Sequence, residues 1–496
     1  MGLAALLGAC SSGSSDGSGN APATAPSPPQ PLLMVSGEGD YWRTGQLASS
    51  ETDADAQTRI TVDPEQTFQT WYGFGGTFNE AGWQALSQLD ARDRTQVLSL
   101  LFDKTDGIGF EWGRIPIGAS DYALSRYSLA SEPGDTALAQ FSIEHDRQLL
   151  IPYIKAAQQI RPDLKLWGSP WSPPPWMKTN NAFDGGAFDP QYFEPYAQYF
   201  VRWIEAYQNE GIPIDHVQPQ NEPGWAQAYP SCAWGPSIAD GEFTDRPVTL
   251  GTFVEQHLAP ALARSGLDTD LWYGTLSNNQ TFEAYWNAVS PAGRALLTGV
   301  GLQWGTSGRA AELAQIKGKN GEPLRVMQTE HMCGNYPWLE ARATGPADAD
   351  RRNFLPDRAP NNHAYAEESW ELIKKWLEAG VNIYSAWNLV LDQGGFNMDT
   401  TRPWPQNALI AVDTQAKRYS VTPAYYVFRH LGQYLQPGAK RVAVEGGSAL
   451  AFQNPDGTVV TTLFNDQATP TQITLAVRDA TAQFEVPARG WATVRW

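Results

Sequence analysis

From about residue 65 onward, short runs of apolar and β-branched residues alternate with longer stretches whose apolar residues recur every three to four positions. The short runs have the length of buried strands, and the longer stretches have the period of amphipathic helices. This alternation is typical of successive βα units, which place their strands in a parallel sheet. We predict eight strands: Trp71–Phe78, Gly113–Gly118, Leu164–Ser169, Ile214–Gln218, Leu271–Leu276, Leu297–Trp304, Leu324–Met327 and Val381–Asn388.

Amphipathic helices are predicted between these strands. One covers Asp189–Gln208 and another covers Tyr365–Ala379, and each is followed by a glycine that stops it. Both carry aromatic stripes, which we interpret as core. A further helix is expected over Pro423–Leu435. Eight strands alternating with helices predict a (β/α)8 TIM barrel over residues 65–435, an α/β fold whose active sites lie at the carboxyl ends of the strands.

Beyond the last predicted helix, the hydrophobic period changes from about four residues to two. Turn-forming residues such as Asn454–Gly457 separate the alternating runs, which predicts an appended antiparallel β-sandwich over residues 436–496. Residues 33–64 contain similar runs, and we expect them to join this sandwich because the barrel does not need them. The predicted strands are Thr58–Val62, Lys440–Val444, Ala449–Gln453, Val459–Phe464, Gln472–Val477 and Ala492–Trp496.

The chain has 496 residues, 42% of them hydrophobic, which suits a large barrel with an accessory module. Its net charge is -18, from 35 basic and 53 acidic residues. Such a chain is repelled by phosphate backbones and anionic lipid surfaces, so we expect no nucleic-acid partner. The 20 tryptophans fit a large core, and they also fit a sugar site, where flat rings pack on apolar C–H faces.

The first ten residues, 1–10, form a short apolar run that ends at Cys10. The run Leu7–Cys10 resembles the lipobox of a bacterial lipoprotein signal, which implies cleavage and lipid attachment at Cys10. Residues 11–32 are rich in Ser, Gly, Ala and Pro, as flexible tethers are. We expect an exported protein that meets a membrane only through this lipid: a cell-envelope lipoprotein of the outer membrane or cell surface, or a secreted protein. The alternative is an ordinary disordered N-terminus.

Two cysteines remain in the body of the chain, Cys232 and Cys333. In an exported protein they could pair, and two buried thiols are an equally good interpretation. The cysteines and histidines lack metal-ligand spacing, and the chain has no Walker or dinucleotide-binding pattern. We therefore expect no metal and no cofactor.

The fourth and seventh predicted strands each end just before a glutamate, Glu222 and Glu330. Because parallel strands end at one rim of a barrel, both acids are expected there. Two facing carboxylates are the minimal equipment for glycoside hydrolysis. The alternative for either glutamate alone is that it caps the following helix. His216 and His331 flank these segments, and we interpret them as structural.

Four motifs occur in order along the predicted barrel: Gly73–Phe78 (GFGGTF), Arg114–Tyr122 (RIPIGASDY), Ser169–Asn180 (SPWSPPPWMKTN) and Gln220–Pro223 (QNEP). Together they resemble family 30 of the glycoside hydrolases, which includes glucocerebrosidase and microbial β-1,6-glucanases. The resemblance covers residues 35–496, including the appended β-sandwich. It implies that the chain is a glycosidase with a carbohydrate partner.

The resemblance implies a role for each matching residue. Glu222 resembles the acid/base and Glu330 the nucleophile. Asn221 resembles the residue that hydrogen-bonds the sugar 2-hydroxyl, and Arg114 the arginine near the nucleophile. Residues resembling the lining of the pocket for the non-reducing glucosyl unit are Asp121, Trp171 and Trp387. The alternatives are a structural ion pair for Arg114, a helix cap for Asp121 and loop packing for Trp171.

The chain departs from the family pattern at the sixth strand, where Gln303-Trp304-Gly305 stands in place of the His-Trp-Tyr run of glucocerebrosidase. The tyrosine that would touch the nucleophile is missing, which weakens a transfer of glucosylceramide specificity. We expect Gln303 and Trp304 to contact the substrate. Aromatic residues that follow strands four and seven are candidates for further subsites, or equally for loop cores: Trp225, Tyr229, Trp234 and Tyr336.

These residues predict a double displacement. Arg114 favours the ionised form of Glu330, and the charge of Glu330 raises the pKa of Glu222 so that it holds a proton. Pro223 is expected to restrict the residues before it to extended geometry. The sequence thus predicts a retaining hydrolase of β-glucan, preferably β-1,6-glucan. Alternatives are a glucosylceramidase, β-glucosidase or β-xylosidase of the same family, and, from another class, a catalytically silent carbohydrate-binding surface lipoprotein.

Overall fold

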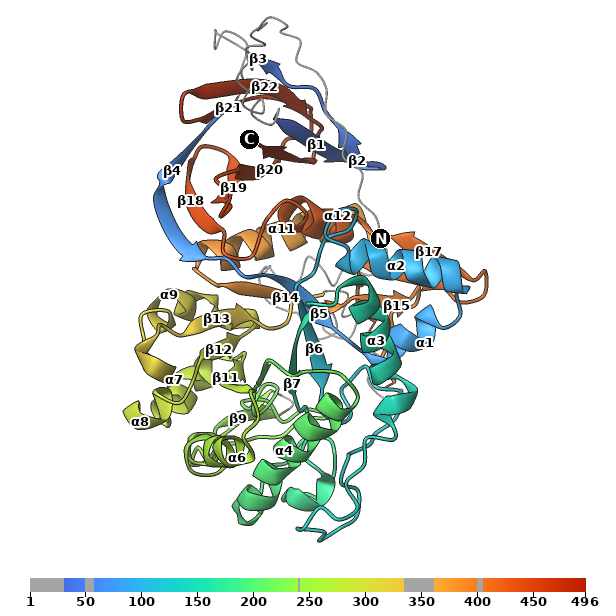
Figure 1. Ribbon diagram of the computed structural model, residues 1–496, viewed down its shortest axis with the longest axis vertical. Helices are drawn as coiled ribbons and strands as arrows, with labels where there is room; N and C mark the ends of the chain where they lie inside the picture. The colour runs from blue at the N-terminus through green and yellow to red at the C-terminus, as the bar shows by residue number, and fades with distance from the viewer. Residues whose placement is uncertain (1–30, 50–57, 240, 334–360, 399–404) are drawn as a thin grey trace, which may run out of the picture.

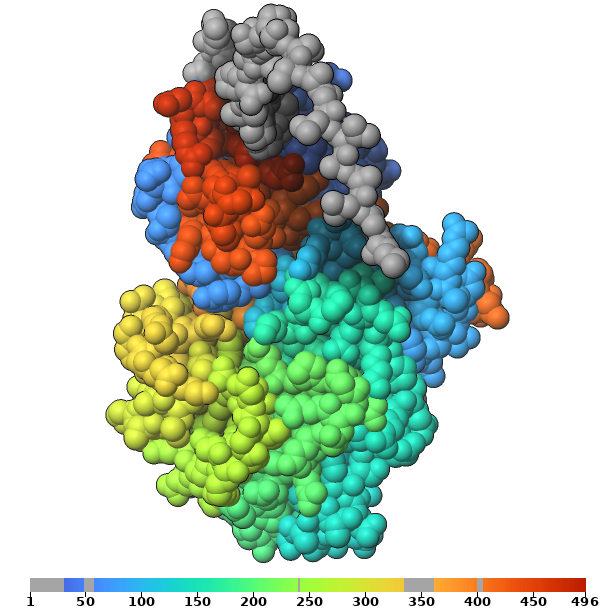
Figure 2. All heavy atoms as spheres, in the orientation of Figure 1, coloured from blue at the N-terminus to red at the C-terminus, as the bar shows by residue number. Residues whose placement is uncertain are grey.

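The computed structural model describes residues 31–49, 58–239, 241–333, 361–398 and 405–496. Figure 1 shows a barrel of strands and helices below a sheet module, and the module combines strands from both ends of the chain, drawn in blue and red. The space-filling view shows the module and the barrel in direct contact on the visible face (Figure 2). Within these ranges, no helix has both the length and the apolar character needed to cross a bilayer.

The barrel is a closed ring of eight parallel strands in the order β11-β12-β13-β14-β5-β6-β7-β8. All eight predicted strands are present, so the predicted (β/α)8 barrel is confirmed. The shortest is β8, but backbone hydrogen bonds from Asp215 and Gln218 to β7 extend its pairing on both sides. The strands are β5 Gly73–Thr77, β6 Trp112–Pro116, β7 Lys165–Ser169, β8 His216–Val217, β11 Asp270–Leu276, β12 Gly299–Leu302, β13 Arg325–Gln328 and β14 Ile383–Asn388.

Helices cover the outside of the barrel (Figure 1). The predicted helix over Asp189–Gln208 begins as a short 3-10 turn, η3, because Pro190 follows an aspartate whose side chain accepts the Gln191 N–H. The helices are α1 Glu80–Leu86, α2 Ala91–Phe102, α3 Leu150–Ile160, α4 Phe193–Asn209, α5 Leu250–Phe253, α6 Ala259–Ser265, α7 Asn279–Asn287, α8 Pro291–Arg294, α9 Ala310–Leu313, α11 His363–Glu378 and α12 Pro423–Gly432. Shorter turns are η1 Asp146–Gln148, η2 Pro175–Met177, η3 Pro190–Tyr192, η4 Val254–Leu258, η5 Trp304–Arg309 and η6 Lys319–Gly321.

Two small sheets lie in segments that follow barrel strands. A hairpin follows β8, and a three-stranded sheet follows β14. These insertions are β9 Ser237–Ala239, β10 Glu242–Thr244, β15 Val390–Asp392, β16 Ile410–Asp413 and β17 Arg418–Val421.

The β-sandwich module has ten strands in the order β2-β1-β23-β20-β19-β18-β4-β21-β22-β3, so strands from before residue 71 lie among the C-terminal ones. Pairing is antiparallel except between β4 and β21. The strand β22 was not predicted, and it completes a hairpin with β21. The strands are β1 Leu32–Gly37, β2 Asp40–Thr44, β3 Ala48–Ser49, β4 Thr58–Thr70, β18 Lys440–Glu445, β19 Ser448–Gln453, β20 Val459–Phe464, β21 Thr471–Val477, β22 Ala480–Val486 and β23 Trp491–Arg495.

The barrel interior is filled by a separate aromatic cluster. Trp167 and Trp272 stack on the two sides of His216, with ring centroids 5.3 Å and 4.2 Å away. Burial lowers the pKa of His216, so its imidazole is neutral. The ring packs between tryptophans in the barrel core, in agreement with the structural role predicted for it. Such a packed interior leaves function to the strand ends.

Cys232 and Cys333 are both buried thiols and are not joined to each other, which decides between the two interpretations left open by the sequence. The Sγ of Cys333 lies 3.2 Å from the Gln406 side-chain oxygen. Burial raises the pKa of Cys232 to about 12, so this thiol is unreactive in the folded protein.

Candidate active site

Arg114 is the centre of the polar cluster at the carboxyl ends of the strands. It lies on β6 and is fully buried. Its Nη1 donates to Glu330 at 2.8 Å, and its Nη2 donates to Asn221 at 2.7 Å. Nε and Nη2 also donate to Ser169 Oγ on the neighbouring strand. One guanidinium therefore ties the segment after β13 to the segment after β8, as a bidentate group is suited to do.

Glu222 and Glu330 both lie at this rim, and they keep only 8% and 6% of their surface exposed. Glu330 pairs with Arg114, whereas the Glu222 carboxylate accepts the Tyr229 hydroxyl at 2.8 Å. Neither contact is that of a helix cap. The structure thus brings the two glutamates, Asn221 and Arg114 together, as the sequence predicts.

The expectation of extended geometry before Pro223 is wrong at Glu222. The φ of Glu222 is 49°, in the left-handed region. Proline disfavours the right-handed helical region for its predecessor, but it does not decide between extended and left-handed backbone. Thr275 decides it here, because its carbonyl and hydroxyl oxygens accept the Glu222 N–H at 3.1 Å and 3.2 Å. The turn re-aims the side chain, at a cost of about 1–2 kcal/mol.

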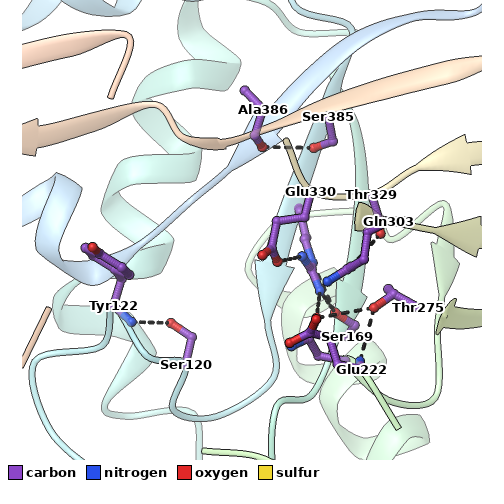
Figure 3. Close-up of polar contacts among 12 residues, drawn as sticks. Ser120, Tyr122, Ser169, Glu222, Thr275, Gln303, Thr329, Glu330, Ser385 and Ala386 are labelled. Carbon is purple, nitrogen blue, oxygen red and sulfur yellow. Dashed lines mark hydrogen bonds and ion pairs between the residues drawn. The ribbon is translucent and has the colours of Figure 1, made fainter. Parts of the chain in front are cut away.

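Gln303, at the end of β12, is oriented by its neighbour across the sheet. Thr329 Oγ1 donates to Gln303 Oε1 at 2.8 Å. This hydrogen bond holds the amide oxygen toward Thr329 and leaves the amide nitrogen on the opposite side. Figure 3 shows the Gln303 nitrogen directed toward Glu222 and the oxygen toward Thr329. Burial raises the pKa of Glu222, and the hydrogen bond from Tyr229 acts to lower it. The buried Gln303 Nε2 has no hydrogen-bond partner among the described residues, so it is able to donate to a ligand oxygen near Glu222.

An aromatic wall lies on the other side of Arg114. The Trp171 ring centroid is 4.1 Å from the Arg114 guanidinium carbon, and Trp387 stacks on Trp171 at 5.3 Å. Asp121 is buried beside this wall, and its Oδ1 has no hydrogen-bond partner among the described residues. Figure 3 places the neighbouring residues Ser120 and Tyr122 across from Glu222. A buried oxygen in this state is suited to accept a ligand hydroxyl.

Burial governs the acidities of the site. It raises the pKa values of Glu222 and Glu330, and it raises that of Asp121 to about 7. Arg114 opposes this shift at Glu330, with which it forms a direct ion pair. The direct ion pair with Arg114 therefore favours the ionised form at Glu330 over the ionised form at Glu222.

The remaining aromatic candidates have different surroundings. Trp225 is half-buried, and its indole N–H donates to Ser277 at 2.9 Å. Trp304 is half-buried with φ 54°. Trp234 is 1% exposed, stacks on Phe188 at 4.2 Å and so belongs to the core of its loop. Tyr336 lies outside the described residues.

Several contacts were not predicted from the sequence: those of Ser169, Thr275, Ser277 and Thr329. Each of these hydroxyl residues lies at or next to the carboxyl end of a barrel strand. That position was the available signal, since polar residues ending apolar strands of a barrel face the active-site rim.

His331, the neighbour of Glu330, is structural. Its ring bonds to the Tyr384 hydroxyl and to Ser369 Oγ, and burial lowers its pKa to about 3. Among the residues that the structure describes, no three His, Cys, Asp or Glu side chains are grouped to hold a metal ion. The rim brings the carboxyl groups of Glu222 and Glu330 together with the buried Arg114 guanidinium.

A closed (β/α)8 barrel with two buried glutamates at the strand ends defines a barrel glycoside hydrolase. The model of the glycosyl hydrolase family 30 TIM-barrel domain matches residues 71–435, and that of the family 30 beta sandwich domain matches residues 438–494. The chain therefore belongs to glycosyl hydrolase family 30 and is a glycoside hydrolase.

Relatives carry two kinds of name. The lysosomal acid glucosylceramidase of Mus musculus is 28% identical over 85% of this chain and 79% of its own length. An endo-1,6-beta-D-glucanase of Neurospora crassa is 31% identical over 43% of this chain and 44% of its own. SrfJ from Salmonella typhimurium (TM-score 0.77, 22% identity) and the endo-beta1,6-glucanase BT3312 (0.74, 23%) share the fold, each over 94% of this chain and 99% of its own.

Proposed function

We propose that this family 30 member is a retaining β-glycosidase that cleaves β-glucan, preferably β-1,6-glucan, with Glu330 as nucleophile and Glu222 as acid/base. The observation that carries the proposal is the Arg114 bridge, which pairs with Glu330 and, through Asn221, adjoins Glu222. The two carboxyl groups therefore differ in environment. One is held as an anion and the other is free to hold a proton, as a double displacement requires.

In the first step, the Glu330 carboxylate attacks the anomeric carbon while Glu222 gives its proton to the glycosidic oxygen. The bond from the anomeric carbon to that oxygen breaks, and an ester bond to Glu330 forms. The leaving sugar departs as a neutral alcohol.

Ester formation removes the negative charge of Glu330, which had helped to keep Glu222 protonated. Glu222, which gave up its proton in the first step, therefore stays ionised and takes a proton from water as the water oxygen attacks the anomeric carbon. Glu330 leaves as a carboxylate and the product keeps the β configuration. Tyr229 stabilises the ionised form of Glu222 in this step through its hydrogen bond.

The glucosyl unit is proposed to lie between the two sides of the site. Trp171 and Trp387 supply apolar surface for its C–H face, and the unpaired Asp121 oxygen accepts one of its hydroxyls. Asn221 bonds the 2-hydroxyl. Arg114 and Thr275 Oγ1 both donate to Asn221 Oδ1, which leaves the amide N–H groups for the sugar.

The substrate preference rests on two observations. Some relatives and structural neighbours are named endo-1,6-β-glucanases, and Gln303 and Gly305 stand where the glucocerebrosidase run has its histidine and tyrosine. Glucosylceramide is the second candidate, because the match to the mouse glucosylceramidase covers more of the chain than the Neurospora match does. Gln303 argues against it, since an amide beside Glu222 suits a hydroxylated leaving group.

The test is product analysis on pustulan, a β-1,6-glucan, and on p-nitrophenyl β-glucoside, with wild type and Glu330→Gln. A ladder of gentio-oligosaccharides that disappears in the variant supports an endo-acting β-1,6-glucanase. Cleavage of the aryl glucoside alone moves the assignment to glucosylceramide or another β-glucoside. Undiminished activity in Glu330→Gln and Glu222→Gln refutes the mechanism, and binding without turnover favours the catalytically silent lipoprotein.

We also propose that the enzyme is exported and held at the cell envelope by a lipid on Cys10, which lies outside the described residues. The resemblance of Leu7–Cys10 to a lipobox supports this. Cys10→Ala in the full-length precursor should release the protein from the membrane fraction. Unchanged fractionation would contradict it.

A further inference from the structure

The junction between the β-sandwich and the barrel carries four half-buried aromatic side chains, which we call the junction row: Tyr41, Trp42, Tyr426 and Tyr434. The first two lie on β2, the edge strand of the sheet, and the others on and just beyond α12. Tyr41 stacks on Tyr426 at 4.8 Å, and Trp42 is within 16° of parallel to Tyr434 at 6.2 Å. Figure 1 shows β2 at the edge of the module, above α12.

The backbone at Trp42 is arranged to make this row. In a regular strand, Tyr41 and Trp42 would point to opposite faces. Trp42 instead has φ 59°, which bulky side chains rarely adopt, and both rings reach residues of the same helix. Ser36 Oγ holds the conformation by accepting the Trp42 N–H at 2.9 Å. Strain of this kind persists where the surroundings enforce it, and it gathers at binding sites.

The junction row continues into a cavity of about 320 Å³, of which Tyr434 forms one wall. The Arg495 guanidinium carbon lies 5.4 Å from the Tyr434 ring, and Arg429 lies 4.3 Å from Trp42. The rest of the lining mixes amides with charges of both signs, including Lys104, Gln433, Gln436, Asn454 and Asp456. Some of these groups are paired with one another, as Gln436 is with Asp456, so a ligand hydroxyl would exchange with such internal hydrogen bonds.

The cavity lies at the opposite end of the barrel from Glu222 and Glu330. Its lining includes Glu111, which directly precedes β6, and Arg161, which shortly precedes β7. These are the amino ends of the strands, whereas the catalytic rim is formed by the carboxyl ends. Only a ligand many sugar units long is able to reach both places.

We propose that the junction row and its cavity form a second, non-catalytic binding site for a β-glucan chain. The proposal rests on the proposed substrate class. A neutral polyhydroxylated chain fits the observations: its C–H faces pack on aromatic rings, and its hydroxyls pair with the amides and charges. A polyanion is disfavoured by the net charge of -18. Such a site raises the local concentration of polysaccharide without touching the reaction.

The test is affinity electrophoresis in native gels containing pustulan, with every variant built on Glu330→Gln so that the gel is not digested. We expect Trp42→Ala and Tyr434→Ala to raise the apparent Kd about fivefold, which corresponds to roughly 1 kcal/mol. Gln436→Ala, an exposed polar change that leaves the rings in place, should also weaken binding. The matched control is Phe68→Ala, whose ring is 41% exposed and lies 3.8 Å from the Arg441 guanidinium, outside the row.

Equal retardation of all variants would overturn the proposal. So would size-exclusion chromatography showing that Tyr434→Ala turns a dimer into a monomer, since the row would then be an interface between copies. In the catalytically competent background, p-nitrophenyl β-glucoside turnover should be unchanged while kcat/KM on pustulan falls. The binding arm does not require turnover, so failure of the proposed mechanism and failure of this site are distinguishable.

Discussion

Replacement of Arg114 by methionine tests the electrostatic basis of the site. In the folded protein, burial raises the pKa of Glu330 and Arg114 lowers it through direct contact. Removing the guanidinium leaves only the burial effect and the repulsion from Glu222 and Asp121. The nucleophile must be ionised to react. The acidic limb of the pH profile of kcat/KM should therefore move to higher pH.

The size of this shift follows from the lost contact. A hydrogen bond to a charged group contributes about 1.5–3 kcal/mol. Because one pKa unit corresponds to about 1.4 kcal/mol, the limb should move by about 1–2 pH units. Arg114→Lys keeps a charge but cannot serve Glu330, Asn221 and Ser169 together, so it should shift the limb less and still lower kcat.

The assay is kcat/KM on p-nitrophenyl β-glucoside over the full pH range, with thermal unfolding of each variant in parallel. The control is Arg325→Met, because Arg325 also lies on a barrel strand beside an aromatic ring but at the amino end. An acidic limb that stays in place in a folded Arg114→Met would refute the reasoning. Equal shifts in both variants would assign the effect to net charge.

Three further changes test other parts of the structure. Tyr229→Phe removes a hydrogen bond that lowers the pKa of Glu222, so the alkaline limb of kcat/KM should move up by as much as about 1 pH unit; an unmoved limb would contradict the contact. Burial raises the pKa of Glu111 from 4.5 to about 8, so its stabilising effect is complete below pH 4.5 and is lost as the pH rises through 8. Calorimetry should therefore find Glu111→Gln equal to wild type near pH 4.5 and more stable by about 1–3 kcal/mol above pH 8, and equal stability at both would refute the shift. Trp234→Phe should lower the free energy of unfolding by about 1–2 kcal/mol with an unchanged product pattern, whereas altered products at unchanged stability would make Trp234 a subsite.

The order of helices and strands could be predicted from the local hydrophobic pattern of the chain. Buried strands need continuous apolar runs and covering helices need a period near 3.6, so both could be located without a structure. Glu222 and Glu330 could be assigned to one rim because parallel strands end together. The strand β22 was missed because Ala480–Val486 includes alanine and glutamine, which favour strands weakly, and its place depends on pairing with β21.

What the sequence could not determine is the set of contacts between distant residues. Arg114 is 216 positions from Glu330 and 107 from Asn221, and only closure of the barrel makes one guanidinium serve both. The left-handed turn at Glu222 depends on Thr275, which lies 53 positions away. Periodicity reports which face of an element is buried, because that is a local property of the chain. The partner, aim and acidity of a buried polar group depend on everything packed around it, and these are decided only when the elements meet.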